Sequence, residues 1–178
     1  MCVTIQLVVP TPDAARVSDA LSSRMSFCGE RIGTAPNGDV VLAVTAARGR
    51  CQCGTSLGSV QAARLNEIAD KRKLATMRRR GWSESKIERW LTEKHRSDTK
   101  HDRALHASAD GATRGDLDAW RALIADVLTT GSGRIGVRVG SDYEIDLEME
   151  PIVVPLEELD APVLRGMAYD SLYRFVLD

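Results

Sequence analysis

The chain has 178 residues, of which 43% are hydrophobic and 28% charged, and its 24 Lys and Arg nearly balance its 25 Asp and Glu. This length and apolar content predict one domain, or two small ones, with a substantial hydrophobic core. No apolar run is long enough to span a bilayer and no basic segment precedes the apolar N-terminal stretch, so we expect no membrane span, no signal peptide and a cytoplasmic protein.

The first 47 residues predict a strand, a helix and a β-hairpin, in that order. Residues 2–9 are rich in β-branched side chains, which favour strands. Residues 13–24 carry apolar side chains at helical spacing. Residues 26–35 and 40–47 are extended runs that flank Pro36-Asn37-Gly38-Asp39, and Asn-Gly between two such runs is a strong hairpin signal.

Four cysteines come together at one end of the sheet that this order predicts. A helix that connects two strands of a sheet makes them run the same way, and a hairpin reverses the third strand. Cys2 begins the first strand, Cys28 lies near the start of the second, and Cys51 and Cys53 follow the end of the third. All four therefore fall at the same end, which predicts a shared metal or thiol site.

Grouped thiolates in a chain without a secretory signal suit tetrahedral zinc, or an iron–sulfur centre, better than disulfides. One Cys-x-Cys and two lone cysteines specify a metal less strongly than paired Cys-x-x-Cys motifs would. One alternative is unligated thiols, with Cys2 and Cys28 as small buried apolar residues. The other is a redox or catalytic thiol at Cys51 or Cys53, or at Cys2 if Met1 is removed.

The near-zero net charge hides an asymmetry along the chain. Residues 1–63 contain five Lys and Arg against four Asp and Glu, residues 64–103 contain thirteen against seven, and residues 104–178 contain six against fourteen. The middle of the chain is therefore basic and its last third is acidic.

The basic middle predicts a helical hairpin. Residues 61–80 lack Gly and Pro and end at Gly81, a suitable C-terminal cap. Ser83 then caps a second helix that extends to about residue 107, with Glu84 at its positive end. The stripe expected on the first helix comprises Leu65, Ile68, Leu74, Ala75 and Met77, and one side of the second carries Ile87, Trp90, Leu91 and Lys94.

Dense positive charge makes this hairpin the expected partner-binding arm. Its candidate binding residues are Lys71, Arg72, Lys73, Arg78, Arg79, Arg80, Trp82 and Trp90. Clustered Lys and Arg attract phosphate, and a tryptophan can stack on an unpaired base, so one hypothesis is a nucleic acid. The alternative, which we favour, is a solvated helix face that pairs with the chain's own acidic last third or with a second copy, and we expect self-association or a protein partner. Interspersed acids weaken the field, and no nucleic-acid-binding motif accompanies it.

A second candidate site lies on the second helix. His95, Asp98, Asp102 and His106 share one narrow helical face. Imidazole and carboxylate at this spacing can chelate a divalent metal or exchange protons. The alternative is a solvated polar stripe, which is common on charged helices.

Residues 131–136, Gly-Ser-Gly-Arg-Ile-Gly, match the pattern G-x-G-x-x-G, but we expect no nucleotide there. That pattern binds a pyrophosphate when it follows a strand and opens a helix. Here residues 115–130 have helical periodicity and a strand follows. A helix C-cap and a tight turn explain the glycines better.

Two alternating segments near the C-terminus predict strands over 134–139 and 143–149, joined by a loop at 140–142. Matching their apolar faces makes Val137 oppose Ile145, sets Arg138 opposite Glu144 and Arg134 opposite Glu148, and leaves Asp146 and Glu150 on an acidic outer face.

The final segments are shorter. Pro151 and Pro155 bracket an edge strand, and residues 156–167 predict a loop with a short helix. The pattern of residues 170–177 fits a helix and a strand equally well.

Together these patterns predict an α+β fold: a mixed or antiparallel sheet from the N- and C-terminal segments, with a central helical pair and one further helix packed on it. The expected parts are 1–58 with the cysteines, 59–108 as the basic arm and 109–178 completing the sheet. The leading functional hypothesis is a metal-stabilised, zinc-containing interaction or adaptor protein whose arm binds a protein partner or itself. The alternatives are a cytosolic thiol- or metal-dependent enzyme using Cys51 and Cys53, and a nucleic-acid-binding protein using the arm.

Overall fold

The computed structural model describes residues 3–46, 56–108, 117–140 and 149–177, with the side chains in these ranges except those of residues 46, 56, 59–65 and 100–108. In chain order the elements are β1 (Thr4–Val9), η1 (Thr11–Asp13), α1 (Ala14–Met25), β2 (Phe27–Thr34), β3 (Val40–Ala46), α2 (Ser56–Arg79), α3 (Glu84–Ser108), α4 (Leu117–Thr130), β4 (Arg134–Gly140), β5 (Ile152–Pro155), η3 (Leu156–Glu158), α5 (Ala161–Gly166) and β6 (Leu172–Val176). The described strands form one six-stranded mixed sheet, which confirms the α+β prediction.

The chain folds into two compact units. The sheet unit combines residues 1–62 with residues 112–178, and the hairpin unit comprises residues 63–111. The N- and C-terminal segments thus build one sheet, as predicted, while the basic middle of the chain forms a unit of its own.

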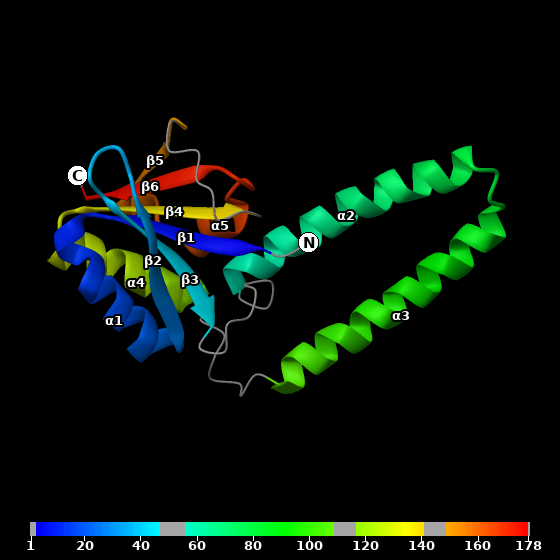
Figure 1. Cartoon of the computed structure of the whole chain (residues 1–178), viewed down its shortest axis with the longest axis horizontal. Coiled ribbons are helices and arrows are strands. Elements are labelled where there is room, and N and C mark those ends of the chain that lie inside the picture. Colours follow the sequence, from blue (N-terminus) through cyan, green and yellow to red (C-terminus); the bar gives the residue numbers. More distant parts are fainter. Residues whose placement is uncertain (1–2, 47–55, 109–116, 141–148, 178) are drawn as a thin grey trace. The chain divides into compact units, whose positions relative to one another are not determined.

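The six strands lie in the order β2-β3-β1-β4-β6-β5 (Figure 1). β3 is antiparallel to both β1 and β2, so β1 and β2 run in the same direction with β3 between them. This is the arrangement that a strand, helix and hairpin in sequence predict. Every residue of β1 is buried, as expected for a central strand covered on both faces.

Helices α1 and α4 lie together along one face of the sheet (Figure 1). The apolar side chains of α4 that recur at helical spacing are all buried, namely Leu117, Trp120, Leu123, Ile124, Val127 and Leu128. The Trp120 ring stacks on Phe27 of β2, with ring centroids 5.9 Å apart. Fully burying one large apolar side chain stabilises a fold by about 2 kcal/mol, so this layer is the main core.

The predicted turn between β2 and β3 is confirmed. The backbone N–H of Ala35 donates to the carbonyl of Asp39 at 2.7 Å. Gly38 has a φ of 85°, a left-handed conformation that favours glycine. The Asn37 side-chain amide donates to the Asp39 carboxylate at 2.8 Å, which fixes the turn from within.

The predicted pairing of residues 134–139 with residues 143–149 is wrong. β4 lies between β1 and β6, and Val137 is opposite Leu7 on one side and Tyr173 on the other. A strand has only two hydrogen-bonding edges, so β4 has no room for a third neighbour over these residues. Residues 141–148, including the predicted loop and the acids expected opposite Arg134 and Arg138, lie outside the described part of the chain.

The last segments complete the far side of the sheet. β5 lies at the sheet edge, parallel to β6, which confirms the proline-bracketed edge strand. The ambiguous pattern at 170–177 folds as strand β6, because this segment fills the place between β4 and β5 and buries Phe175. The short helix expected within 156–167 is α5, which Asp160 caps by accepting the Val163 N–H at 2.7 Å.

The hairpin unit contains α2 from Ala63 onward, together with α3. Helix α2 itself begins at Ser56, earlier than the predicted residue 61. The connecting turn has Gly81 at a φ of 76°. The Ser83 hydroxyl accepts the Lys86 N–H at 3.4 Å, as expected of an N-cap. Arg78 donates to both carboxylate oxygens of Glu84, at 2.9 and 3.1 Å, and so joins the two helices across the turn. None of the helices in the described ranges has the length and apolarity needed to cross a membrane.

Candidate functional site

The sheet has the end that we predicted for the four cysteines. Ile5 lies opposite Val44, and Phe27 lies opposite Ala46. The starts of β1 and β2 and the end of β3 therefore share one end of the sheet, as the predicted topology requires.

Only one of the four cysteines belongs to the described residues. Cys28, the second residue of β2, is exposed and forms no disulfide. Cys2, Cys51 and Cys53 lie outside the described part, so the shared metal site stays a prediction. No three His, Cys, Asp or Glu side chains among the described residues are grouped closely enough to hold a metal.

Cys28 lies on the face of β2 that points away from α1 and α4. Its neighbour Phe27 stacks on Trp120, and a Cβ at Gly29 would lie 3.2 Å from Leu21 of α1, so both neighbours face the helices. Successive side chains of a strand point to opposite faces. A metal held by Cys28 would therefore lie on the opposite face of the sheet.

The second candidate site is only partly described. Asp98 already accepts from the Lys94 ammonium at 2.9 Å, so a metal at Asp98 would have to compete with this cation. His95 is exposed, and the side chains of Asp102 and His106 lie outside the described part. This site also stays a prediction.

The facing sides of α2 and α3 meet through few apolar side chains. Met77 and Ile87 are buried, whereas Leu74, Trp90 and Leu91 are half-buried. Among the described side chains of the hairpin unit, polar contacts therefore accompany a small set of apolar contacts.

An ion pair joins the middle of the two helices. The Lys94 ammonium donates to Asp70 of α2 at 2.7 Å as well as to Asp98, and the Lys94 and Asp70 side chains are 24% and 22% exposed. The hydrogen bond to Asp70, followed by that to Asp98, raises the pKa of Lys94. Lys94 is therefore engaged within the hairpin.

The apolar residues predicted to form one stripe on the first helix lie on two sides of α2, so that prediction is wrong. Met77 is buried, whereas Ile68 is 49% exposed and Ala75 is exposed as well. Consecutive helical residues are about 100° apart, which places Ile68 and Ala75 on the side of α2 opposite Met77. One face of α2 packs within the hairpin, and on the opposite face the described Ile68 and Ala75 are exposed.

Three of the candidate cations are engaged inside the hairpin unit. Lys71 pairs with Glu67 at 2.7 Å, and Arg78 pairs with Glu84. The Arg78 hydrogen bond is the main reason that the pKa of Glu84 lies below its usual value. The third cation is Lys73, whose ammonium lies 4.6 Å from the centre of the Trp90 ring.

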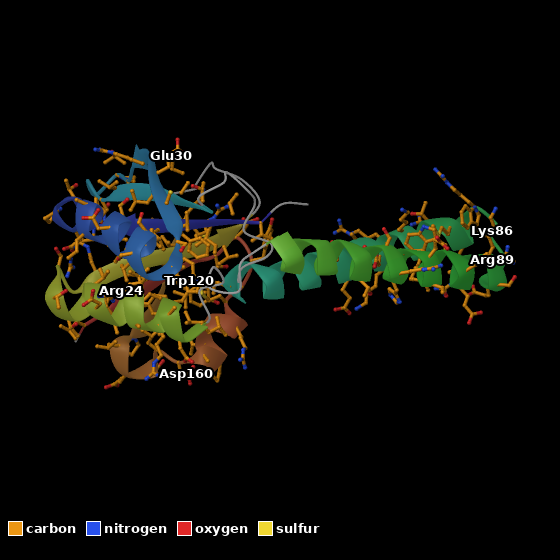
Figure 2. The ribbon with its side chains drawn as sticks, turned by 90° about the horizontal axis from the view of Figure 1, so that it is seen from below. Arg24, Glu30, Lys86, Arg89, Trp120 and Asp160 are labelled. Carbon is orange, nitrogen blue, oxygen red and sulfur yellow. The ribbon has the colours of Figure 1, made fainter. Side chains whose placement is uncertain are left out.

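A lysine ammonium lies over the ring of each candidate tryptophan. Besides Lys73 on Trp90, the Lys86 ammonium lies 4.1 Å from the centre of the Trp82 ring. Figure 2 shows Lys86 and Arg89 near the turn end of α3. A base that stacked on the same ring face would have to displace the lysine and its cation–π attraction.

The remaining candidate cations are arginines without an acidic partner. Arg72, Arg79 and Arg80 are exposed, and among the described residues none of them forms an ion pair. Arg89 and Arg96 of α3 are exposed and unpaired in the same sense. Because residues seven apart lie two helical turns apart on one face, Arg72 and Arg79 form one pair and Arg89 and Arg96 another.

The glycine-rich turn after α4 is occupied by the protein's own carboxylate. Asp13, whose side chain is 8% exposed, accepts the backbone N–H of Ser132 at 2.9 Å and a hydrogen bond from Arg16 at 3.2 Å. Burial acts to raise the pKa of Asp13, but the Ser132 hydrogen bond and the Arg16 charge outweigh it and lower this pKa. The predicted order of helix, turn and strand is confirmed.

Two glycines of this turn have local explanations. A Cβ at Gly131 would come within 2.6 Å of the Val127 carbonyl oxygen and 2.7 Å of the Asp13 carboxylate. Gly133 has a φ of 71°, which a residue with a side chain rarely adopts. The geometry therefore accounts for the motif without a ligand, and the absence of nucleotide binding stays a prediction.

Sequence reasoning missed a buried polar group on the face of the sheet opposite α1 and α4. Arg138 of β4 is 5% exposed and donates to Gln6 of β1 at 2.7 Å and to Asp170 at 2.7 Å. Gln6 is fully buried, and Asp170 has a φ of 61°. The signal was Gln6 itself, because an amide within an otherwise buried strand requires a buried partner.

Comparison of the chain with protein-family models, with curated proteins and with solved structures finds no match. The function is therefore inferred from the side chains and surfaces described above.

Proposed function

We propose that this chain is an interaction protein whose hairpin unit binds an acidic protein surface. The main support for this proposal is a contrast among the cations of the hairpin unit. Lys71, Lys94 and Arg78 pair with acids of the unit, and Lys73 lies over the Trp90 ring. Arg72, Arg79 and Arg80 are exposed and have no acidic partner among the described residues. A guanidinium is always charged and binds a carboxylate through two parallel hydrogen bonds. These arginines are therefore suited to carboxylates supplied by a partner.

The distribution of charge favours a protein over a nucleic acid. By helical periodicity, the Arg72 and Arg79 pair lies on the side of α2 that faces away from the hairpin interior, and the Arg89 and Arg96 pair does the same on α3. The exposed Glu93 lies four residues after Arg89 and three before Arg96, within the same basic face. A phosphate-binding surface gathers its cations on one side and excludes acids, and the hairpin does neither.

The proposal includes a metal, zinc by the chemistry of the thiolates, at the sheet end near Cys28. Its support is the strand order, which brings the starts of β1 and β2 and the end of β3 together. A structural zinc ion can contribute on the order of 10 kcal/mol to folding. Elemental analysis of the purified chain tests this part: we expect bound metal that Cys51→Ser releases, together with a sharply lower melting temperature. Metal-free protein, or an unchanged melting curve with metal retained, would refute it.

Photo-cross-linking in cell extract tests the partner. A photoreactive amino acid replaces Arg79 in the full chain, and Arg121, an exposed arginine of α4, in a matched control. We expect protein adducts from position 79 that resist nuclease, are absent from position 121 and decrease when Arg72→Gln and Arg80→Gln are added. Nuclease-sensitive adducts, or equal adducts from both positions, would contradict the proposal.

A further inference from the structure

We infer that the outer face of α2 formed by Ile68, Arg72, Ala75 and Arg79, called the outer seam below, binds an acidic amphipathic helix of another protein. This inference rests on the proposed function and specifies both the surface of the hairpin and the kind of partner.

The spacing of the outer seam is that of a helix-packing surface. Its residues follow one another at intervals of four, three and four, which is the repeat of positions a and d in a coiled coil. All four residues lie within α2 and are exposed. At a rise of 1.5 Å per residue the seam is about 16 Å long, enough for three turns of a partner helix.

The outer seam combines an exposed apolar group with charge that has no acidic partner among the described residues. The Arg79 guanidinium donates to the Ala75 carbonyl at 3.4 Å. Ile68 is 49% exposed and is the large apolar side chain left exposed among the described residues of the hairpin unit. Ala75 is small and exposed, so a second helix can approach closely there. Arg72 and Arg79 form no ion pair with the described residues. The adjacent Lys71 is paired with Glu67, and this neutral pair leaves the arginine field uncompensated.

The two arginines decide the nature of the partner. A helix that packs its apolar side on Ile68 and Ala75 must place groups beside Arg72 and Arg79, and burying a guanidinium without an anionic partner is costly. On a protein helix that anionic group is a carboxylate. Leucine or alanine facing the seam, flanked by Glu or Asp, supplies both contacts. The partner helix is therefore acidic and amphipathic.

The outer seam of a second copy does not fit the outer seam of the first. Two seams packed in parallel would set Arg72 and Arg79 directly opposite their equivalents. An antiparallel packing would still bring four unpaired guanidinium groups into one contact about 16 Å long, and like charges at such positions disfavour pairing. Charge thus disfavours self-association through two outer seams.

The test uses the full chain and a synthetic peptide of about four heptads with leucine at a and d and glutamate beside them, at about 0.15 M salt. The control peptide has the same composition in an order without heptad spacing. Arg72→Glu with Arg79→Glu changes the seam, and Arg89→Glu with Arg96→Glu makes the same change in charge at the same spacing on α3. Ile68→Ser tests the apolar part, and Arg72→Gln with Arg79→Gln serves if the glutamate variant fails to fold.

We expect the heptad peptide to gain helical signal on binding, and each seam variant to weaken binding about tenfold or more, while the α3 variant changes it less than about twofold. Equal loss in both arginine pairs, or equal binding of the control peptide, would overturn the seam and leave the proposed function intact. A dimer in sedimentation that Arg72→Glu with Arg79→Glu dissociates would replace the occupant with a second copy and so overturn the inference. Binding of a DNA or RNA duplex, without binding of either peptide, would overturn both the seam and the proposed function.

Discussion

The buried carboxylate of Asp13 is expected to stabilise the turn after α4. Its carboxylate accepts the Ser132 N–H at 2.9 Å and lies 3.2 Å from Arg16. A hydrogen bond to a charged group is worth about 1.5–3 kcal/mol. The Arg16 side chain is 35% exposed, so solvent screening limits the ion pair to about 0.5 kcal/mol. Asp13→Ala should therefore lower the free energy of unfolding by about 2–3.5 kcal/mol.

Asp13→Asn separates the hydrogen bond from the charge. The asparagine amide oxygen can still accept the Ser132 N–H, so the loss should be only about 1 kcal/mol. Asp19→Ala, at an exposed aspartate of α1, is the matched control and should change the free energy of unfolding by less than about 0.5 kcal/mol. Urea denaturation followed by fluorescence measures these losses, in a Trp82→Phe, Trp90→Phe background that leaves Trp120 of the sheet unit as the reporter.

The pH dependence has a defined sign. The folded-state pKa of Asp13 lies below its ordinary value of 3.8, so the stabilisation is present above that value and is lost as pH falls through the lowered pKa. The difference between the parent chain and Asp13→Ala should therefore shrink in acid. The reasoning is refuted if Asp13→Ala costs nothing at neutral pH, or if Asp13→Asn is as costly as Asp13→Ala.

Three further predictions concern other contacts. Gly131→Ala should lower the free energy of unfolding by about 1–3 kcal/mol in urea denaturation, because the added Cβ would lie 2.6 Å from the Val127 carbonyl oxygen. The control Gly166→Ala, whose Cβ would have nothing within 4 Å, should change it very little. Neither the parent chain nor these variants should show saturable nucleotide binding in calorimetry. Arg138→Ala should cost about 1–3 kcal/mol, because it removes the hydrogen bond that the buried Gln6 side-chain oxygen accepts. A change below about 0.5 kcal/mol would contradict this. Lys94→Met should reduce the protection of backbone amides from hydrogen exchange in α2 and α3 while leaving α4 unchanged, and unchanged protection in α2 and α3 would count against this role of Lys94. Because the pKa of Lys94 is raised, its stabilisation is present below the ordinary value of 10.5 and is lost as pH rises through the raised pKa.

Local patterns determined much of the secondary structure. The Asn37-Gly38 turn was predictable because only a few residue types tolerate its left-handed conformation. Helix α4 was predictable because its buried side chains repeat at the helical period. The order of strand, helix and hairpin also determined the direction of the first three strands, since connection rules leave few alternatives.

The sequence did not determine which residues the candidate functional groups contact. The sequence identified the basic arm, but Arg72 and Arg78 look alike in it, and only the folded hairpin pairs Arg78 with Glu84 while leaving Arg72 exposed. Likewise, the spacing of Ile68 and Met77 does not say which side of α2 meets α3. An amphipathic pattern with apolar residues on two sides allows either side to be buried.

For most of the described segments the sequence by itself determined which element forms, whereas the tertiary structure decided which segments meet and made residues 172–176 a strand. Alternation in β4 predicts a strand, yet its neighbours are β1 and β6, distant in sequence, and not the segment that follows it. Asp13 and Ser132 are likewise 119 residues apart. Periodicity and turn propensity are properties of a few consecutive residues, whereas strand pairing and buried ion pairs depend on which distant surfaces bury the most apolar area and satisfy the most polar groups together.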